Sequence, residues 1–280
     1  MLFISTSSVK TNKISTAIES LVAAGFKNIE LSGGTKYYEG WDADIIDFQK
    51  KYGLNLLCHN YFPPPEHDFV LNLASLDDDV FNKSIDHIRK VIEFSAKICA
   101  RKYAFHAGFF MNPQTSHLGK SIPKLELSDK NKAVKRFFEG YEIVHNLAGD
   151  LTLYIENNVL SSTNFANYGS NPFMLTNFRE YIELQQIMPF NLLLDVAHLK
   201  VSCSTLGMDF ESQFLKLAAV TDYIHISDND GLHDQNMGFS KNSDLFKLLS
   251  DADLQSKTIT LEVYDEMDSI IKCADLLEKL

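Results

Sequence analysis

Side chains that bind metal ions or transfer protons are concentrated just after one apolar segment of the chain. The stretch YIHISDNDGLHDQN, residues 223–236, begins like the end of a buried strand. It then brings six such side chains together within a dozen positions: His225, Asp228, Asp230, His233, Asp234 and Asn236. Carboxylates and imidazoles are ligands of divalent cations and are also general acids and bases. The stretch therefore predicts metal-assisted chemistry, if the fold brings further groups of the same kind to it.

Eight short apolar segments, rich in β-branched and aromatic residues, predict eight strands. They cover residues 2–6, 27–32, 54–59, 102–107, 151–157, 191–196, 222–227 and 258–263. Several are almost continuous apolar runs, which is typical of strands that are covered on both faces. Helical patterns with one apolar face lie between them. These cover residues 12–25, 42–53, 77–100, 128–149, 176–188, 209–220, 242–252 and 268–280.

This alternation of strands and helices predicts a parallel sheet, because each crossover must be long enough to hold a helix. Eight such units in 280 residues predict an α/β fold, a (β/α)8 TIM barrel, as a single domain over residues 1–280. The rival is an open doubly wound sheet, which usually carries a glycine-rich phosphate turn after its first strand. The corresponding turn here, STSSVK at residues 5–10, contains no glycine. We therefore favour the barrel.

In such a barrel the active site forms at the carboxyl ends of the strands. Seven of the eight predicted strands deliver a carboxylate or an imidazole to this end: Glu30, His59, His106, Glu156, Asp195, His225 and Glu262. Each one alone is more simply explained as a helix cap or as a hydrogen-bonded structural residue. Together, however, buried carboxylates would repel one another, and a divalent cation would remove that cost. The mixture of oxygen and nitrogen ligands without cysteine favours Mn²⁺, Mg²⁺, Co²⁺ or Zn²⁺ over a structural zinc.

The composition and the net charge of the chain limit the kinds of partner that it is expected to bind. The net charge is −11 and the pI is about 5.2, which disfavours nucleic acid, because nucleic-acid binding needs a basic footprint. Four cysteines without CxxC spacing indicate a reduced compartment. The first residues do not resemble a signal peptide, and no apolar run approaches the roughly 20 residues that span a bilayer. We therefore expect a cytoplasmic protein with a small-molecule substrate and no membrane partner; a homo-oligomer is allowed.

Two predicted strand-to-helix loops are long, at about residues 107–129 and 158–174. Loops of this length in a compact domain are often lids or walls of a substrate site. They contain aromatic residues that could face an apolar surface or a sugar ring: Phe109, Phe110, Tyr168 and Phe173. The alternative is that these aromatic side chains only cover the top of the barrel.

The ordered set of strand-end motifs resembles the xylose-isomerase-like barrels, which include sugar and sugar-phosphate isomerases and epimerases and the endonuclease IV family. The motifs are FKNIELSGG, CHNYFPP, FHAGF, YIENN, LLLDVAHLK, HISDNDGLHDQNMG and TLEVYD. They follow the family's order and cover nearly the whole chain. Asp-x-x-His after the sixth strand, His-x-x-Asp-Asn after the seventh and Glu in the eighth make the set specific.

The resemblance implies a divalent metal held by Glu156, Asp195, His225 and Glu262. In the epimerase branch, the same two glutamates flank the substrate carbon, and His198 contacts a substrate oxygen. In the endonuclease branch, a further metal is held by His59, His106 and Glu156. A third metal uses His198, Asp234 and a histidine at the position where this chain has Asn236. This last difference sets the chain apart from the trinuclear type. In addition, MGFSKNSDLF stands in place of the family's usual Gly-x-Gly plus Ile-Asp pattern and keeps only Gly238, so the substrate loop departs from the family's geometry.

We therefore expect an isomerase or epimerase of a small sugar or keto-sugar. Glu156 and Glu262 would transfer a proton between opposite faces of the substrate through a metal-stabilised enediolate. The expected substrate-binding residues are His59, His106, His198, His233 and Asp234. A hydride shift at the same metal remains open. Metal-assisted hydrolysis of a phosphoester and a non-enzymatic sugar-binding barrel are the alternatives.

Overall fold

The computed structural model describes residues 1–117 and 120–280, so positions 118 and 119 of the first predicted long loop lie outside the described residues. Eight parallel strands close into a barrel in the order of the chain. They are β1 (Leu2–Ser5), β2 (Asn28–Leu31), β3 (Asn55–His59), β4 (Lys102–His106), β5 (Thr152–Glu156), β6 (Asn191–Asp195), β7 (Tyr223–Ile226) and β8 (Thr258–Leu261). The predicted α/β barrel is confirmed, and each predicted strand differs from the observed one by at most two residues at an end.

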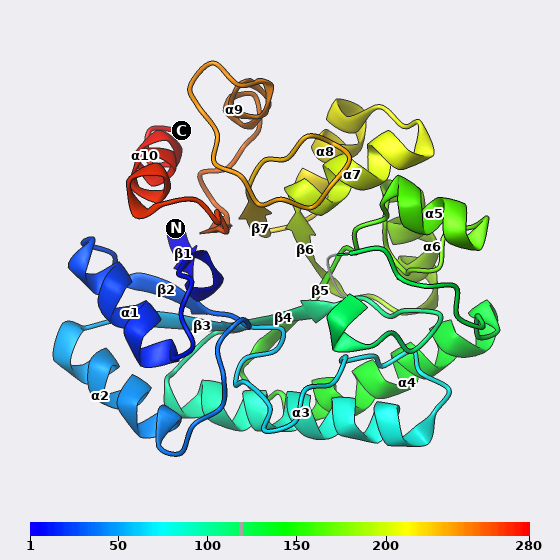
Figure 1. Ribbon diagram of the computed structural model, residues 1–280, viewed down its shortest axis with the longest axis horizontal. Coiled ribbons are helices and arrows are strands. Elements are labelled where there is room, and N and C mark those ends of the chain that lie inside the picture. Colours follow the sequence, from blue (N-terminus) through cyan, green and yellow to red (C-terminus); the bar gives the residue numbers. More distant parts are fainter. Residues whose placement is uncertain (118–119) are drawn as a thin grey trace.

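Ten α-helices in the described residues form the outer ring of the barrel (Figure 1). They are α1 (Ile14–Ala23), α2 (Trp41–Tyr52), α3 (Asp78–Lys97), α4 (Lys130–Leu147), α5 (Ser162–Tyr168), α6 (Phe178–Ile187), α7 (Val196–Leu206), α8 (Phe210–Ala218), α9 (Asp244–Ser250) and α10 (Met267–Leu277). The helical patterns predict all of them except α5, which lies in a predicted loop, and α7, which follows β6 directly. None of the described helices has the length and apolar composition of a membrane span.

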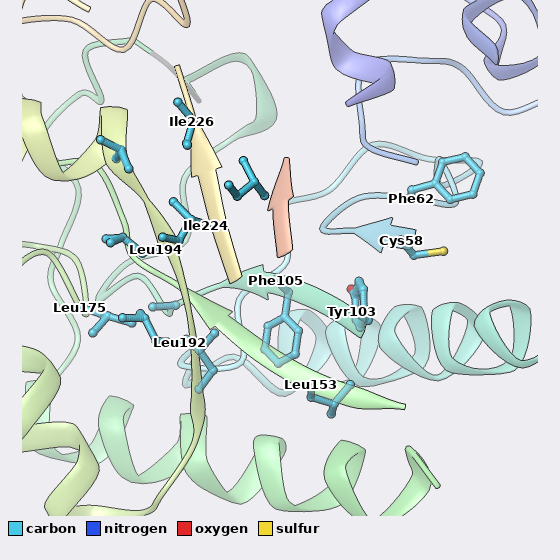
Figure 2. Packing of buried hydrophobic residues seen from close by; sticks show 14 of the residues in the cluster. Cys58, Phe62, Tyr103, Phe105, Leu153, Leu175, Leu192, Leu194, Ile224 and Ile226 are labelled. Carbon is cyan, nitrogen blue, oxygen red and sulfur yellow. The ribbon is translucent and has the colours of Figure 1, made fainter. Parts of the chain in front are cut away.

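Side chains alternate between the two faces of each strand, so the barrel has two separate apolar regions. The outward side chains pack against the helices; Figure 2 shows several of them, among them Phe105, Leu153, Leu194 and Ile224. The inward side chains form a second buried cluster that fills the barrel: Phe3, Leu57, Ala104, Tyr154, Leu193 and Tyr223. Two residues further along, the same inward face carries the polar strand-end groups. The inner apolar layer is therefore the floor of the site.

Gly108, just after β4, lies where a side chain has no room. A Cβ atom at this position would lie 2.4 Å from Ala74 Cβ and 2.9 Å from Met174 Sδ. The backbone cannot easily move away, because Gly108 O accepts a hydrogen bond from Met174 N at 3.0 Å. We expect Gly108→Ala to lower the free energy of unfolding by about 1–3 kcal/mol through overpacking. Urea denaturation measures this change.

Gly33 provides the matched control. Its nearest neighbour would be Tyr61 Cβ at 3.4 Å, an ordinary van der Waals contact. We expect Gly33→Ala to change the free energy of unfolding by no more than about 0.5–1 kcal/mol, in either direction. Equal losses for the two variants would contradict the packing argument.

His87 of α3 gives the stability of the fold a pH dependence that is separate from the strand-end cluster. Its side chain is 5% exposed, and its Nε2 has no hydrogen-bond partner within the described part of the chain. Burial lowers the pKa of His87 from 6.5 to about 4. Between these two pH values the unfolded chain binds more protons than the folded one, so stability falls as the pH falls.

We expect this group to account for about 2–3 kcal/mol of the stability that is lost between pH 7 and pH 4.5. Urea denaturation of the wild type and of His87→Gln at both pH values isolates the contribution of this group. The variant should lose less stability than the wild type over this interval. Parallel losses in the two proteins would contradict the assignment.

Candidate active site

The strand-end carboxylates and imidazoles lie together directly above the inner apolar layer. Six of the seven are buried, with exposures of 8% or less: Glu30, His59, Glu156, Asp195, His225 and Glu262. The seventh, His106 on β4, is partly exposed and borders the cavity above the barrel. The parallel register places Glu156 beside His106 and Asp195 beside His225. Adjacent strands thus bring oppositely charged or complementary groups into contact.

Glu156, Asp195 and His225 form one group that is able to hold a metal ion. One ligand atom from each residue lies within 4.8 Å of the other two. Two atoms that bind one ion at about 2.0–2.6 Å cannot be more than about 5 Å apart, so the spacing is suitable. Asp195 also begins α7, because its Oδ1 accepts a hydrogen bond from His198 N at 2.7 Å. This cap fixes the direction of the carboxylate.

Glu262 contacts His225 and is thereby linked to this metal-binding group. Its Oε2 lies 3.2 Å from His225 Nδ1. Its Oε1 accepts hydrogen bonds from Ser7 Oγ at 2.7 Å and from the Tyr264 hydroxyl at 3.0 Å. These donors come from the loop after β1 and from the residues after β8, and they hold the carboxylate at the floor of the cavity. The pattern of strand-end residues in the sequence does not identify Ser7 or Tyr264 as part of the site.

A second group shares Glu156. It consists of His106, Glu156 and His198, again with ligand atoms within 4.8 Å of one another. His59 adds to it, because His59 Nε2 lies 2.8 Å from Glu156 Oε2. His198 Nε2 lies 3.3 Å from Asp234 Oδ2, on the wall of the cavity. All the substrate-binding residues expected from the sequence except His233 thus surround Glu156 or His198.

The pKa values of neighbouring groups are displaced in opposite directions, as is common in functional sites. Although burial opposes it, the imidazoles of His106 and His59 hold the pKa of Glu156 well below its usual range. Burial raises the pKa of Asp195 to about 7, and the nearby Glu156 carboxylate contributes to the rise. Burial lowers the pKa of His106 to about 4. A cation would favour an ionised Asp195 and a neutral His106.

Unpaired polar atoms also fit a cation. Within the described residues, Asp234 Oδ1 is a buried atom without a hydrogen-bond partner, and His106 Nδ1 faces only the Glu156 carboxylate, at 3.1 Å from Oε2. Burying such an atom costs free energy unless it is paired or bound to a metal. The donor set is composed of oxygen and nitrogen atoms, which suits Mn²⁺, Mg²⁺, Co²⁺ or Zn²⁺. The residues present therefore fit a divalent cation.

The cavity above this cluster has two lobes. The larger, of about 680 Å³, is bordered mainly by hydroxyl, amide and backbone groups of the loops after β1 and β2, and it reaches Glu156 and Glu262. The smaller, of about 200 Å³, lies between the long loops and includes Phe109 and Phe173. Tyr61, His106, His198 and Asp234 border both lobes. Of the metal-binding residues, His106 and His198 therefore lie where the two lobes meet, and Glu156 borders the larger lobe.

Comparison with known proteins identifies the family to which this fold and site belong. The sequence model of the xylose isomerase-like TIM barrel family matches residues 18–280. The chain belongs to this family. A curated relative, a probable endonuclease 4 of Thermotoga petrophila, is 28% identical over 111 residues, which is 39% of this chain and 31% of that protein.

Several solved structures share the barrel at low sequence identity. A D-tagatose 3-epimerase-like protein superposes with a TM-score of 0.72 at 15% identity, covering 99% of this chain and 96% of that one. Endonuclease IV from Thermus thermophilus superposes with a TM-score of 0.61 at 14% identity, covering 100% of this chain and 99% of that one. Other sugar epimerases are also similar. At these identities the likeness shows the fold, and it leaves the reaction open between the branches of the xylose isomerase-like family.

The loop after β7 differs from the pattern of the endonuclease branch of the xylose isomerase-like family. Asn236 stands where the resemblance implies a histidine, and its backbone oxygen accepts a hydrogen bond from Tyr264 N at 2.7 Å. His233 borders the smaller lobe, but its side chain is 70% exposed and pairs with Asp230. Lys200 binds Asp228 Oδ1 at 2.6 Å, so it braces this loop.

Some residues of the long loops and strand ends have places that the sequence does not predict. Phe109 and Phe173 border the cavity, whereas Phe110 borders a separate groove and the Tyr168 hydroxyl donates to Pro123 O. Asn157, next to Glu156, is a structural link. Its side-chain amide exchanges hydrogen bonds with the backbone of Asp195 at 2.7 and 3.0 Å. Its position in YIENN, directly after a predicted ligand, is the only signal in the sequence.

Proposed function

We propose that this protein is a divalent-metal-dependent isomerase or epimerase of a small sugar or sugar derivative. The observation that carries the proposal is the position of the group Glu156, Asp195 and His225 beneath a polar cavity of about 680 Å³. Cavities of this size are typical of small-molecule sites. The similarity to several sugar epimerases supports the same reaction class.

The lining of the larger lobe suits a ligand with many hydroxyl groups. It is rich in short polar side chains and in glycine, which exposes the backbone: Thr6, Ser7, Thr11, Asn12, Ser32, Gly33, Gly34 and Thr35. Such groups donate and accept hydrogen bonds over short distances. His198 and Asp234 add an imidazole and a carboxylate that orient a substrate oxygen near Glu156.

Glu156 and Glu262 are the proposed proton carriers. Although burial opposes it, hydrogen bonds from His225 and Ser7 hold the pKa of Glu262 at about 2, so that it is ionised at neutral pH and ready to accept a proton. The imidazoles of His106 and His59 likewise lower the pKa of Glu156, so this carboxyl group is also ionised at neutral pH. One carboxylate removes the proton from the substrate carbon. The other carboxylate first takes up a proton from solvent and then delivers it to the opposite face of the same carbon; acid–base assistance of this kind contributes about 10²–10⁴-fold to the rate. A bound cation supplies Lewis-acid stabilisation of the negative charge that develops on the substrate oxygens.

Turnover in deuterium oxide tests the proposal. The protein, loaded in turn with Mn²⁺, Mg²⁺, Co²⁺ and Zn²⁺, is given a panel of ketoses, sugar phosphates and nucleotide sugars. We expect one class of sugar to be converted with deuterium incorporated at a single carbon. Conversion without deuterium would replace proton transfer by a hydride shift. No conversion of any sugar by the metal-loaded protein would contradict the proposed function.

A second candidate is metal-assisted hydrolysis of a phosphoester. The shared position of Glu156 in two metal-binding groups favours it, because two ions are able to bind both the attacking and the leaving oxygen. The similarity to a probable endonuclease 4 points the same way, whereas the net charge of −11 disfavours a DNA substrate. Metal analysis separates the two: one tightly bound ion per chain favours the isomerase, and two or three favour the hydrolase.

A further inference from the structure

We propose that Glu30 is a positioning residue that fixes the orientation and the tautomer of His225, so that Nδ1 of this imidazole faces the metal-binding group. The inference rests on the proposed function, because it assigns His225 to a metal. Glu30 is the penultimate residue of β2, on the opposite side of the barrel from β6, and its side chain is fully buried. A buried carboxylate is costly unless it is paired, so its contacts define its role.

Both oxygens of Glu30 are occupied by donors from two strands, β7 and β8, and from the loop after β2. Oε2 accepts hydrogen bonds from the Tyr223 hydroxyl and from Thr260 Oγ1, the latter at 2.8 Å. Oε1 lies 3.0 Å from His225 Nε2 and accepts a hydrogen bond from Ser32 Oγ at 3.3 Å. With this many contacts the carboxylate has one orientation. It is also surrounded by donors, which is the arrangement that stabilises its ionised form.

The consequence for His225 follows from the hydrogen-bonding capacity of the two groups. An ionised carboxylate only accepts hydrogen bonds, so the proton between Glu30 and His225 is on Nε2. The lone pair of a neutral imidazole is then on Nδ1. This atom faces Glu262 Oε2 at 3.2 Å and Asp195 Oδ2 at 4.0 Å. A lone pair that faces two carboxylates is unfavourable unless a cation lies between them.

This arrangement matches the general way in which proteins hold a metal-binding histidine, with a carboxylate on the far ring nitrogen. The alternative is that Glu30 is itself a ligand, because Glu30, His59 and His225 also have atoms within 4.8 Å of one another. Three hydroxyl groups already bind the Glu30 oxygens, and an ion at this place would displace them. The contacts therefore favour a positioning role.

Zinc titration of the metal-free protein tests the role of Glu30 without relying on activity. We expect Glu30→Gln to bind Zn²⁺ about 10–100-fold more weakly than the wild type, because the neutral amide no longer polarises His225. Thr260→Val is the matched control. It removes one donor to Glu30 and leaves the Glu30–His225 contact in place, so its affinity should change by no more than a few-fold. Thermal unfolding establishes that both variants are folded.

The ring nitrogens of the wild type give an independent result that needs no variant. Long-range ¹H–¹⁵N spectra of the zinc-loaded protein should show His225 with zinc on Nδ1 and a proton on Nε2. Two results would overturn the role of Glu30 and leave the metal centre standing. One is zinc bound to Nε2 of His225, and the other is a Glu30→Gln variant that binds zinc as tightly as a tightly binding wild type. Absence of tight zinc binding by the wild type would overturn the proposed metal centre, and the role of Glu30 with it.

Discussion

Replacing Glu262 with glutamine is expected to lower kcat by about 10²–10⁴-fold, the usual contribution of a general acid or base. Glutamine has the same shape and keeps an oxygen that accepts from Ser7 and Tyr264, so the barrel should fold normally. The amide is not basic, however, and cannot carry a proton away from the substrate. Steady-state kinetics on the sugar that the panel identifies, together with the thermal unfolding midpoint, measure both effects.

The control for this variant is Glu266→Gln, four residues further along. Glu266 is exposed, and its side chain does not cap α10. The Glu266→Gln variant should therefore have the same kcat as the wild type. If Glu262→Gln also turns over at the wild-type rate, Glu262 is not a proton carrier and the proposed mechanism is wrong.

Removal of divalent cations by a chelator is expected to lower turnover by at least about 10³-fold, because Lewis-acid stabilisation contributes several kcal/mol to the transition state. Addition of Mn²⁺, Mg²⁺, Co²⁺ or Zn²⁺ should restore it. The physical reason is the buried cluster of Glu156, Asp195 and His225, whose carboxylates form ion pairs only with imidazoles among the residues that the structure describes.

The same treatment should lower the thermal unfolding midpoint, since an ion that binds only the folded chain stabilises it. This readout does not depend on knowing the substrate. Full activity and an unchanged midpoint after exhaustive chelation would show that the cluster works without a metal.

The strands and the inner polar layer could be predicted because both follow from local rules. Strand-length apolar runs predict the eight strands, and a carboxylate or imidazole at the end of seven of them marks the mouth of the barrel. Helix α7 could not be predicted in this way. It follows β6 without a loop, and its residues from Val196 to Cys203 are buried almost all round, so the sequence has no polar face to reveal a helical period. Helix α5 was missed for the opposite reason, because its sequence STNFANY is mostly polar.

The finer features of the site depend on contacts between distant segments. Glu30 could be recognised as a strand-end residue, but its contacts with Tyr223 and Thr260 cross the barrel. The sequence also could not show that Phe109 faces the cavity while its neighbour Phe110 borders a different groove. Such choices are set by the direction of each side chain after the loops have packed.

Anomalous diffraction from crystals of the manganese-loaded protein tests the central claim most directly, because it places the ion among the side chains. We predict one strong peak in contact with carboxylate oxygens of Glu156 and Asp195 and with Nδ1 of His225. No peak at these residues, or a peak only between Glu30, His59 and His225, would contradict the assignment of the metal centre.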